Sequence, residues 1–343
     1  MKEHVDKASY GFQLFNSKKK LVFLILTICG SILITLLMFG QDVSLKHVIC
    51  YLKPEQQRNR FIAANRMKQQ NNKFDRLEDS HQKGMKRRLP QAIIIGVRKG
   101  GTRALLELIA IHPDVAKCGR EVHYFDKEEN YRQGLEWYRR KMPYSYPHQV
   151  TIEKSPAYFI TEEAPGRIHQ MNASMKLIVI VRDPVLRVIS DYTQIHEIKT
   201  EQGLTHERFE DLVIQNGEIN TSYKAVRISM YSKYIQRWKQ YFSGNQILVV
   251  DGDALISNPL PELKHVERFL GLHDFISDQN LYLNKTKGFY CMKKEDETSK
   301  CLSNSKGRKH PDIDQTVIEK LQKFYQPYNE KFYEIVGRTF NWP

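Results

Sequence analysis

Three cationic side chains lie in or directly after a glycine-rich loop, Gly96-Val-Arg-Lys-Gly-Gly101-Thr-Arg. Glycines let such a loop turn tightly and direct its backbone N–H groups at an anion, and the N-terminus of a following helix adds positive potential. The Gly-x4-Gly spacing is typical of nucleotide phosphate loops, but Thr102 and Arg103 stand where an NTPase places Lys and a Mg²⁺-binding Ser or Thr. Arg98, Lys99 and Arg103 therefore indicate metal-free anion binding, and an ordinary strand–helix turn is the alternative.

Two further pairs of side chains have the chemistry of a reaction site. Glu121 and His123 would share one face of a strand or extended segment. A glutamate base acting near neutral pH benefits from burial or crowding that raises its affinity for protons, and a His or Lys neighbour tunes this affinity. Arg182 and Ser190 combine a guanidinium fork with a hydroxyl, which suits a phosphate group. The alternatives are a solvated Glu–His surface pair and an ion pair between Arg182 and Asp183.

The elements that must position these residues alternate between strand and helix. Short apolar runs at Ile93–Ile95, Leu177–Val181 and Gln246–Val250 predict buried parallel strands. Apolar residues at helical spacing over Ala104–Ile111, and the run after Asp183-Pro184, predict helices. The pattern predicts an α/β fold with a central parallel sheet and helices on both faces. Ligands bind at the carboxyl ends of the strands in such sheets, and the candidate residues follow those ends.

The N-terminal part of the chain predicts a membrane anchor. Leu21–Phe39 is an uncharged apolar run of 19 residues, and Lys18, Lys19 and Lys20 precede it. Its length as a helix approaches the hydrocarbon thickness of a bilayer. Lysines on the N-terminal side favour a cytoplasmic N-terminus and a lumenal C-terminus. A cleaved signal peptide is the alternative, but its apolar region is usually about 7–15 residues long.

The resulting organisation is a cytoplasmic tail over 1–20, a signal anchor over 21–39, a polar lumenal stem over 40–88 and one domain over 89–343. Glycosylation sequons at Asn172, Asn220 and Asn284 agree with a lumenal domain. The formal net charge of +14 favours a polyanionic partner such as nucleic acid, anionic lipid or sulfated glycan. The sequence contains no recognised nucleic-acid-binding motif, and a lumenal domain argues against that partner.

The cysteines agree with an oxidising compartment. Cys29 lies in the apolar run, Cys50 in the stem, and Cys118 stands alone. Cys291 and Cys301 bracket a short polar segment without a hydrophobic face of its own, which a disulfide would hold in the lumen. A zinc pair is the alternative, although no further ligands lie nearby at zinc spacing.

Six motifs in order, GVRKGGTRALLE, REVHYFD, IEKSPAYF, VRDPVLRVISDYTQ, GFYC and KGRKHP, resemble the heparan sulfate glucosamine 3-O-sulfotransferase family from about Leu89 to Pro343. The resemblance implies a P-loop NTPase-like sulfotransferase fold in a Golgi type II membrane protein. It also implies the sulfate donor PAPS (3′-phosphoadenylyl sulfate), no metal requirement, and an acceptor that is the 3-hydroxyl of N-sulfated or N-unsubstituted glucosamine in heparan sulfate. The expected products are the antithrombin-binding and the viral-glycoprotein-binding sites, and the oligomeric state stays open.

The resemblance also assigns catalytic roles. Glu121 is implied as the base for the acceptor hydroxyl, His123 as its neighbour, and Asp126 as the residue that orients the pair. Lys99 and Lys154 are implied at the transferring group, with a turn at Ser155-Pro156 presenting Lys154.

The binding residues follow from the same motifs. The implied donor-binding residues are Lys99, Gly100, Gly101, Thr102, Arg103, Arg182, Ser190, Tyr290, Lys306, Gly307, Arg308, Lys309 and His310. Within this set, the run from Lys306 to His310 is expected to form a lid, with Tyr290 beside the adenine. The implied acceptor-binding residues are Arg98, Glu121, Val122, His123, Tyr124, Phe125, Asp126, Lys154, Ser155, Pro156, Gln194, Tyr223 and Lys224.

Two other functions compete with the enzyme. A membrane-anchored heparan sulfate-binding protein with an inactive sulfotransferase fold would keep the basic cleft but lose the base or the loop lysine, whereas Glu121, Lys99 and Lys154 are all present. A nucleotide kinase would need the Lys-Ser/Thr pair that Thr102 and Arg103 replace.

Overall fold

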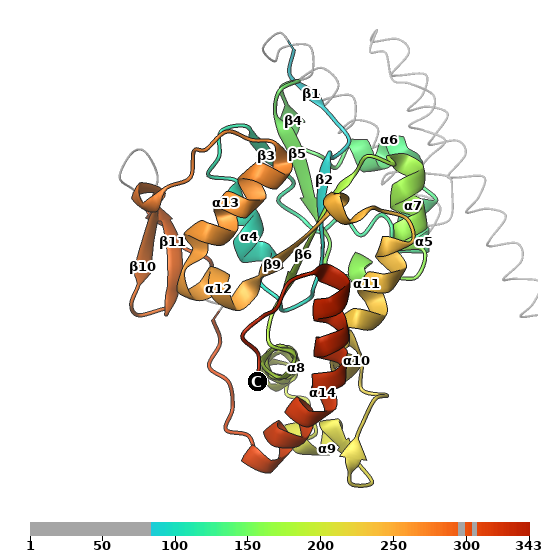
Figure 1. Ribbon diagram of the computed structural model, residues 1–343, viewed down its shortest axis with the longest axis vertical. Coiled ribbons are helices and arrows are strands. Elements are labelled where there is room, and N and C mark those ends of the chain that lie inside the picture. Colours follow the sequence, from blue (N-terminus) through green and yellow to red (C-terminus); the bar gives the residue numbers. More distant parts are fainter. Residues whose placement is uncertain (1–83, 294–298, 304–306) are drawn as a thin grey trace, which may run out of the picture. The chain divides into compact units, whose positions relative to one another are not determined.

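The computed structural model describes residues 84–293, 299–303 and 307–343. Its central sheet has five parallel strands: β2 (Ala92–Gly96), β3 (Val115–Lys117), β5 (Val150–Lys154), β6 (Lys176–Val181) and β9 (Ile247–Asp251). They lie side by side in the order β3-β5-β2-β6-β9, so the first of them in the chain, β2, lies between β5 and β6 (Figure 1). The carboxyl ends of all these strands therefore meet at one edge of the sheet, where such sheets bind ligands.

Alternate side chains of the central strands pack on opposite faces of the sheet. In β2, Ile93 and Ile95 lie in one buried hydrophobic cluster and Ile94 lies in another, because successive strand residues point to opposite faces. Helices α7 (Ala164–Met171), α11 (Tyr231–Lys239) and the C-terminal half of α14 (Gln315–Val336) contribute to the first cluster. Helices α4 (Thr102–Ile109), α12 (Gly252–Ser257) and α13 (Pro259–Leu270) contribute to the second.

A third hydrophobic cluster lies between α8 (Pro184–Glu201), α9 (Phe209–Val213), α10 (Lys224–Ile228) and the N-terminal half of α14. Helix α8 begins directly after β6 because Asp183 caps it: the Asp183 carboxylate accepts hydrogen bonds from Val185 N (2.7 Å) and Leu186 N (3.0 Å). The remaining elements are short. The helices among them are α5 (Glu128–Tyr131), α6 (Gly134–Arg139) and the 3₁₀ helices Tyr158–Ile160, Gly244–Gln246 and Asp278–Asn280. Two strand pairs complete the set: β1 (Lys86–Arg87) with β4 (Tyr144–Ser145), and β7 (Ile214–Gln215) with β8 (Glu218–Ile219).

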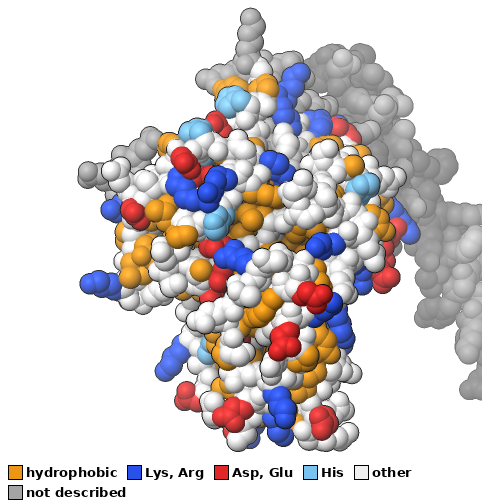
Figure 2. Space-filling view, in the orientation of Figure 1, with side chains coloured by type: hydrophobic (Ala, Val, Ile, Leu, Met, Phe, Trp, Pro, Cys, Tyr) orange, Lys and Arg blue, Asp and Glu red, His pale blue; other side chains and the backbone are white. Residues whose placement is uncertain are grey.

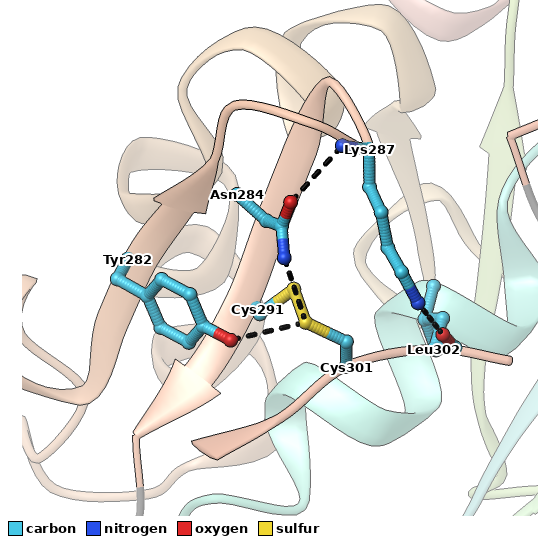
Figure 3. The surroundings of a disulfide bond; sticks show 6 residues. All are labelled: Tyr282, Asn284, Lys287, Cys291, Cys301 and Leu302. Carbon is cyan, nitrogen blue, oxygen red and sulfur yellow. Dashed lines mark hydrogen bonds between the residues drawn. A yellow bond between two sulfur atoms is a disulfide. The ribbon is translucent and has the colours of Figure 1, made fainter. Parts of the chain in front are cut away.

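A small antiparallel sheet, β10 (Leu281–Asn284), β11 (Phe289–Lys293) and β12 (Ser299–Lys300), precedes the last helix. A disulfide between Cys291 and Cys301, S–S 2.00 Å, joins β11 to the residue after β12 (Figure 3). The Tyr282 hydroxyl lies 3.1 Å and the Asn284 amide nitrogen 3.7 Å from the Cys301 sulfur. The predicted disulfide is therefore confirmed, and the alternative, in which the two cysteines bind zinc, does not apply because their sulfurs are bonded to each other.

The predicted α/β class with helices on both faces of a parallel sheet is confirmed. Each predicted strand and the first predicted helix agree with β2, β6, β9 and α4 to within about two residues, which is the usual accuracy of element ends. The expectation that Glu121 and His123 share a strand or extended face is wrong. The run from Glu121 to Asp126 lies in no helix or strand, and His123 has a left-handed backbone with φ of 52°.

Several predictions fall on residues 1–83, which lie outside the described residues: the tail 1–20, the anchor 21–39, most of the stem 40–88, and Cys29 and Cys50. Across the part of the chain that the structure describes, no helix combines the length and the apolar character needed to cross a bilayer. Within the stem range, β1 pairs with β4 of the domain. The sequon residues Asn172, Asn220 and Asn284 are partly exposed, and glycosylation there stays a prediction.

Candidate active site

One large cavity, with a volume of about 1300 Å³, opens where the carboxyl ends of β2, β5, β6 and β9 meet. Its walls bring together side chains from Arg98 near the start of the domain to His310 near its end. The predicted site residues that line it are Arg98, Lys99, Gly101, Thr102, Arg103, Glu121, His123, Lys154, Pro156, Arg182, Ser190, Gln194, Tyr223, Lys224, Tyr290, Gly307, Arg308 and His310.

Other predicted residues lie outside the cavity lining: Gly100, Val122, Tyr124, Phe125, Asp126, Ser155 and Lys309. The side chains of Val122, Tyr124 and Phe125 are buried in the cluster that covers one face of the sheet, and Ser155 is 0% exposed. These side chains pack into the protein and support the loop from within, and acceptor binding by these residues stays a prediction. Lys306 lies outside the described residues.

The glycine-rich loop wraps closely over the end of β6. Val97 N donates to Ile180 O at 2.9 Å, and Gly100 N donates to Val97 O at 2.8 Å. Gly101 has φ of 108°, and α4 begins with the next residue, so the N-terminus of α4 points at the cavity edge. A glycine-rich loop that leads into a helix N-terminus is the geometry that binds phosphate groups.

We expect Gly100→Ala to damage this loop severely. A Cβ at Gly100 would lie 2.4 Å from Ile180 O, a backbone atom that cannot move away without distorting β6. Overpacking of this kind costs about 1–3 kcal/mol, so the unfolding free energy falls by that amount. Binding of 3′-phosphoadenosine 5′-phosphate, the desulfated form of the implied donor, weakens at least about tenfold in titration calorimetry because the distorted loop no longer directs its N–H groups at phosphate. Gly244→Ala is the matched control, since its Cβ would meet nothing within 4 Å.

The cations of the loop are held apart by acidic and polar partners. Arg98 pairs with Asp191 at 2.9 Å, and Lys99 donates to the Gln194 amide oxygen at 3.2 Å. Arg103 contacts Glu107 at 2.7 Å and donates to Gly119 O at 2.6 Å. These contacts fix several positive charges around one end of the cavity, where an anionic ligand would neutralise them.

The pair predicted to bind a second phosphate, Arg182 and Ser190, lines the same cavity as this loop. Arg182, at the end of the strand β6, and Ser190, on α8, both line the cavity, as their spacing predicts. The alternative ion pair between Arg182 and Asp183 is not the one formed: Arg182 Nε lies 2.7 Å from Asp253 Oδ1, while the Asp183 carboxylate caps α8. Gly252 packs so closely against Gly100 O and Arg182 that a Cβ there would lie 2.4 Å and 2.7 Å from them.

Glu121 lies within a compact group of charged side chains. His123 Nε2 is 3.3 Å from Glu121 Oε2, and His123 Nδ1 is 2.8 Å from Asp126 Oδ2. Lys154, the last residue of β5, hydrogen-bonds to the other oxygen of Glu121. A turn follows directly, since Tyr158 N donates to Ser155 O at 3.1 Å. Glu121, His123 and Lys154 thus meet at the cavity wall, and Asp126 orients His123 from behind.

The electrostatics of this group favour an ionised glutamate and a protonated histidine. Burial alone would raise the pKa of Glu121, but hydrogen bonds from His123 and Lys154 and their positive charges lower it to about 2. Hydrogen bonds to Asp126 and Glu121 raise the pKa of His123 to about 9, against the opposing effect of burial. The Glu121 carboxylate is therefore ionised across the physiological pH range, but the expectation that its surroundings raise its affinity for protons is wrong, because His123 and Lys154 lower that affinity.

The segment after the small antiparallel sheet reaches over the phosphate-binding end. Tyr290, Gly307, Arg308 and His310 line the cavity, and Arg308 pairs with Glu197 of α8. Burial, together with the positive charges of Arg182 and Lys99, lowers the pKa of His310, and all three side chains line the same cavity. The predicted lid therefore adjoins the glycine-rich loop in the described part of the chain.

Reduction of the Cys291–Cys301 disulfide should loosen this lid. The cross-link closes a loop with a sequence separation of 10, for which chain entropy gives a stabilisation of about 2–3 kcal/mol. Cys301 lines the cavity beside the lid residues, so we expect 3′-phosphoadenosine 5′-phosphate to bind about 3- to 10-fold more weakly after dithiothreitol treatment. Titration calorimetry measures the affinity, and a Cys291→Ser/Cys301→Ser variant that dithiothreitol weakens further would contradict the assignment to this bond.

The predicted acceptor side of the cavity carries mixed charge. Arg98, Gln194, Tyr223 and Lys224 line it together, and burial with the nearby Asp191 charge raises the pKa of Tyr223 to about 12. Basic and acidic side chains are interspersed on the face in Figure 2, so the net positive charge forms no single unbroken surface there.

Several residues of the site were not predicted. The buried ion pair Arg187–Asp191, at 2.8 Å, joins α8 to the glycine-rich loop through Arg187 Nη1 and Arg98 O, 3.2 Å apart. The i,i+4 spacing of these two residues was the available signal. The other cavity-lining residues with chemical groups that the motifs did not single out are Glu107, Lys287, Lys300 and Ser303.

Comparison with known proteins agrees with this geometry. Residues 89–336 match the family model described as "Sulfotransferase domain". The chain is 57% identical over 268 residues to the Mus musculus protein named heparan sulfate glucosamine 3-O-sulfotransferase 5, covering 78% of each chain. It is 59% identical over 257 residues to the Homo sapiens protein of the same name, covering 74% of each. This is the isoform that the sequence motifs resemble.

Among solved structures, a sulfotransferase from Alicyclobacillus acidocaldarius has a TM-score of 0.55 at 16% identity, covering 74% of this chain and 98% of that one. That likeness concerns the fold. With the sheet, the cavity and the shared sequence taken together, this chain belongs to the heparan sulfate glucosamine 3-O-sulfotransferase family.

Proposed function

We propose that this enzyme transfers a sulfuryl group from PAPS to the 3-hydroxyl of N-sulfated or N-unsubstituted glucosamine in heparan sulfate. The observation that carries the proposal is the meeting of Glu121, His123 and Lys154 with the glycine-rich loop in one cavity, in a chain 57% identical to a protein of that name. The breadth of acceptors, with antithrombin-binding and viral-glycoprotein-binding products, stays a prediction from the resemblance.

In the proposed reaction Glu121 accepts the proton of the acceptor hydroxyl as its oxygen forms a bond to sulfur. The S–O bond to the donor phosphate breaks, and 3′-phosphoadenosine 5′-phosphate leaves with the bonding electron pair. PAPS, when bound, supplies the sulfuryl group on a phosphate leaving group. Lys99 and Lys154 stabilise the negative charge that grows at that phosphate, a contribution that often dominates such barriers. His123 and Asp126 hold Glu121 in place.

The residues present fit this donor. The close backbone approach at Gly100 leaves no room for a side chain, and Thr102 and Arg103 follow at the start of α4. Arg182 and Ser190 suit the 3′-phosphate, and Tyr290, which lines the same cavity, would stack on the adenine. Lysine and arginine side chains supply the positive charge, so the proposal includes no catalytic metal.

The inactive heparan sulfate-binding protein is a weaker alternative. Such a protein has no need to direct Glu121, Lys99 and Lys154 into the same cavity, yet all three line it.

We further propose that the enzyme is a single-pass type II protein of the Golgi membrane, with the tail at 1–20, the anchor at 21–39, the stem at 40–88 and the catalytic domain at 89–343 in the lumen. The uncharged run after three lysines supports the anchor. The disulfide supports an oxidising compartment.

The test uses the purified full chain, radiolabelled PAPS and N-sulfated heparan sulfate, followed by disaccharide analysis that locates the label. Label at the glucosamine 3-O position supports the proposal. An acceptor whose 3-hydroxyls are already sulfated is the control and should receive none. A chain that binds heparan sulfate but moves no sulfuryl group to any position would instead be the anchored binding protein.

A further inference from the structure

The loop that carries Glu121 and His123 has no regular structure to fix it. It lies in no helix or strand, and His123 adopts φ of 52°, a conformation that non-glycine residues rarely take without support. A proton-accepting carboxylate must nevertheless be held in a narrow range of positions relative to the reacting hydroxyl. Side chains that bind the loop backbone must therefore do this.

One serine hydroxyl binds two successive N–H groups of that loop. Val122 N and His123 N both donate to Ser155 Oγ, each at 3.1 Å. The next N–H, of Tyr124, donates to the Tyr158 hydroxyl at 2.9 Å. Three consecutive backbone donors next to Glu121 are thus satisfied from one segment, the end of β5 and the turn after it.

The loop carbonyls are held from the other side. The Asn130 side-chain amide donates to Val122 O at 3.2 Å and to His123 O at 2.9 Å. Asn130 belongs to α5, which follows the loop in the chain, so this contact keeps the loop closed on itself. The contact with Ser155 instead ties the loop to the central sheet.

A serine hydroxyl has one proton and two lone pairs, and its orientation is set by where the proton goes. Ser155 donates its proton to Glu153 Oε1, and both lone pairs are then left for the two N–H groups. Glu153 is 0% exposed. Its Oε2 accepts from the Tyr138 hydroxyl at 3.3 Å, and Val122 N lies 3.4 Å from Oε1.

We propose that Glu153 and Ser155 are positioning residues for the catalytic loop: the buried carboxyl fixes the Ser155 hydroxyl, and the hydroxyl holds the backbone that places Glu121 and His123. The inference rests on the proposed function. Side chains alternate along the end of β5, so Lys154 reaches the cavity while its two neighbours face the protein interior. The same three residues therefore set the position of the base relative to Lys154.

The arrangement tolerates protonation of Glu153. Burial raises the pKa of Glu153 to about 7, although hydrogen bonds from Ser155, Val122 N and Tyr138 oppose the effect. A proton on Oε2 would face the Tyr138 oxygen, which can accept it, and Oε1 would still accept from Ser155. A glutamine at 153 reproduces this neutral form, with its amide oxygen toward Ser155 and its NH₂ toward Tyr138.

The test compares Ser155→Ala, Glu153→Leu and Glu153→Gln in the full chain. Ser155→Ala and Glu153→Leu should lower kcat about 10- to 100-fold, as small misplacements of catalytic groups do, with KM for PAPS and the calorimetric Kd for 3′-phosphoadenosine 5′-phosphate changed less than about twofold. Glu153→Gln should keep kcat within about threefold, because it keeps the acceptor for the Ser155 proton. Ser145→Ala is the matched control: Ser145 is equally buried and bonds only to Thr151 Oγ1, at 2.9 Å, among the contacts of its side chain that the structure describes.

A second readout does not depend on activity. NMR titration of isotope-labelled histidine should show the His123 pKa, which is raised to about 9 in the intact site, moving toward its ordinary value in Ser155→Ala but not in Ser145→Ala. The signal is assigned by its loss in His123→Gln. Wild-type kcat, an unchanged His123 titration, or a loss of nucleotide affinity that parallels the loss of kcat in Ser155→Ala would overturn the inference. A wild-type chain without transferase activity would contradict the proposed function instead, and the titration would still decide the positioning role.

Discussion

Glu121→Gln is expected to lower kcat by about 10²- to 10⁴-fold, the usual contribution of a general base, while nucleotide binding stays intact. Glutamine has the size of glutamate and its amide oxygen can still accept a hydrogen bond from Lys154, but it cannot take a proton from the acceptor hydroxyl. The residues proposed to bind the donor phosphates lie on other elements, so the Kd for 3′-phosphoadenosine 5′-phosphate should change less than about threefold. Initial rates with radiolabelled PAPS give kcat, and calorimetry gives the affinity.

The matched control for Glu121→Gln is Glu129→Gln, the same change at an exposed position of α5. It should leave kcat unaltered. If Glu121→Gln retained more than about a tenth of the wild-type kcat, another group would have to take the proton, and the assignment of the base would be wrong.

The pH dependence of kcat/KM reports the same carboxylate, because this ratio follows the ionisation of the free enzyme. The pKa of Glu121 is lowered to about 2, so its proton-accepting form is present above that pH and is lost only as the pH falls through it. The acidic limb due to Glu121 should therefore lie well below the ordinary glutamate value of 4.5. Lys154 is one cause of the lowering, so an anion that draws Lys154 away makes Glu121 a stronger base.

Much of the fold was predictable because its core strands are uniformly apolar. The runs at β2, β6 and β9 contain almost only Ile, Leu and Val, which identifies buried parallel strands. Strand β5, Val-Thr-Ile-Glu-Lys, was missed because two of its residues carry charges that are usually exposed. In the structure Glu153 is 0% and Lys154 is 3% exposed. The interruption of the apolar pattern in β5 thus marks the residues that serve the site.

The site was predictable as a set of residues but not as a set of contacts. The sequence places Lys99 and Arg182 after predicted strand ends, and a parallel sheet brings such ends together, whereas Lys154 ends the strand β5 that was missed. It does not reveal that Arg182 pairs with Asp253, 71 residues later in the chain. Such pairs depend on how helices pack against the sheet, and nearby Asp183 was the more obvious partner from spacing alone.

The left-handed backbone of His123, like the Arg182–Asp253 ion pair, could not be predicted from the sequence. Histidine adopts positive φ more often than most non-glycine residues but still rarely, so its presence alone did not predict this conformation. Its cause is tertiary: the N–H groups of Val122 and His123 converge on the Ser155 hydroxyl, which comes from β5 and not from the loop. The Glu-x-His spacing therefore brought the two side chains together by a turn, and not by the extended strand that was expected.

The second large effect is expected at the phosphate-binding loop: Lys99→Met should lower kcat about 10²- to 10³-fold, the range found when one preorganised charge is removed from a site where charge develops. Methionine keeps most of the apolar stem of lysine but none of its charge. Lys99 lines the cavity at the N-terminal side of α4, and its charge reaches far enough to lower the pKa of His310 in the lid. The charge is thus directed at the end of the cavity where the leaving phosphate would lie.

The same variant should be no less stable than the wild type, which separates a catalytic charge from a structural one. Residue 99 has φ of 69°, and lysine and methionine, which are both unbranched at Cβ, adopt this backbone conformation at similar cost. Lys99 lines the cavity together with Arg98, Arg103 and Arg182. Removing one of several like charges relieves repulsion, so the unfolding midpoint of Lys99→Met should stay level or rise. Lys127→Met, at an exposed lysine beside the Glu121 loop, is the control for loss of a positive charge. A fall in kcat that came with a fall of more than about 5 °C in the midpoint would mean that Lys99 holds the loop together instead.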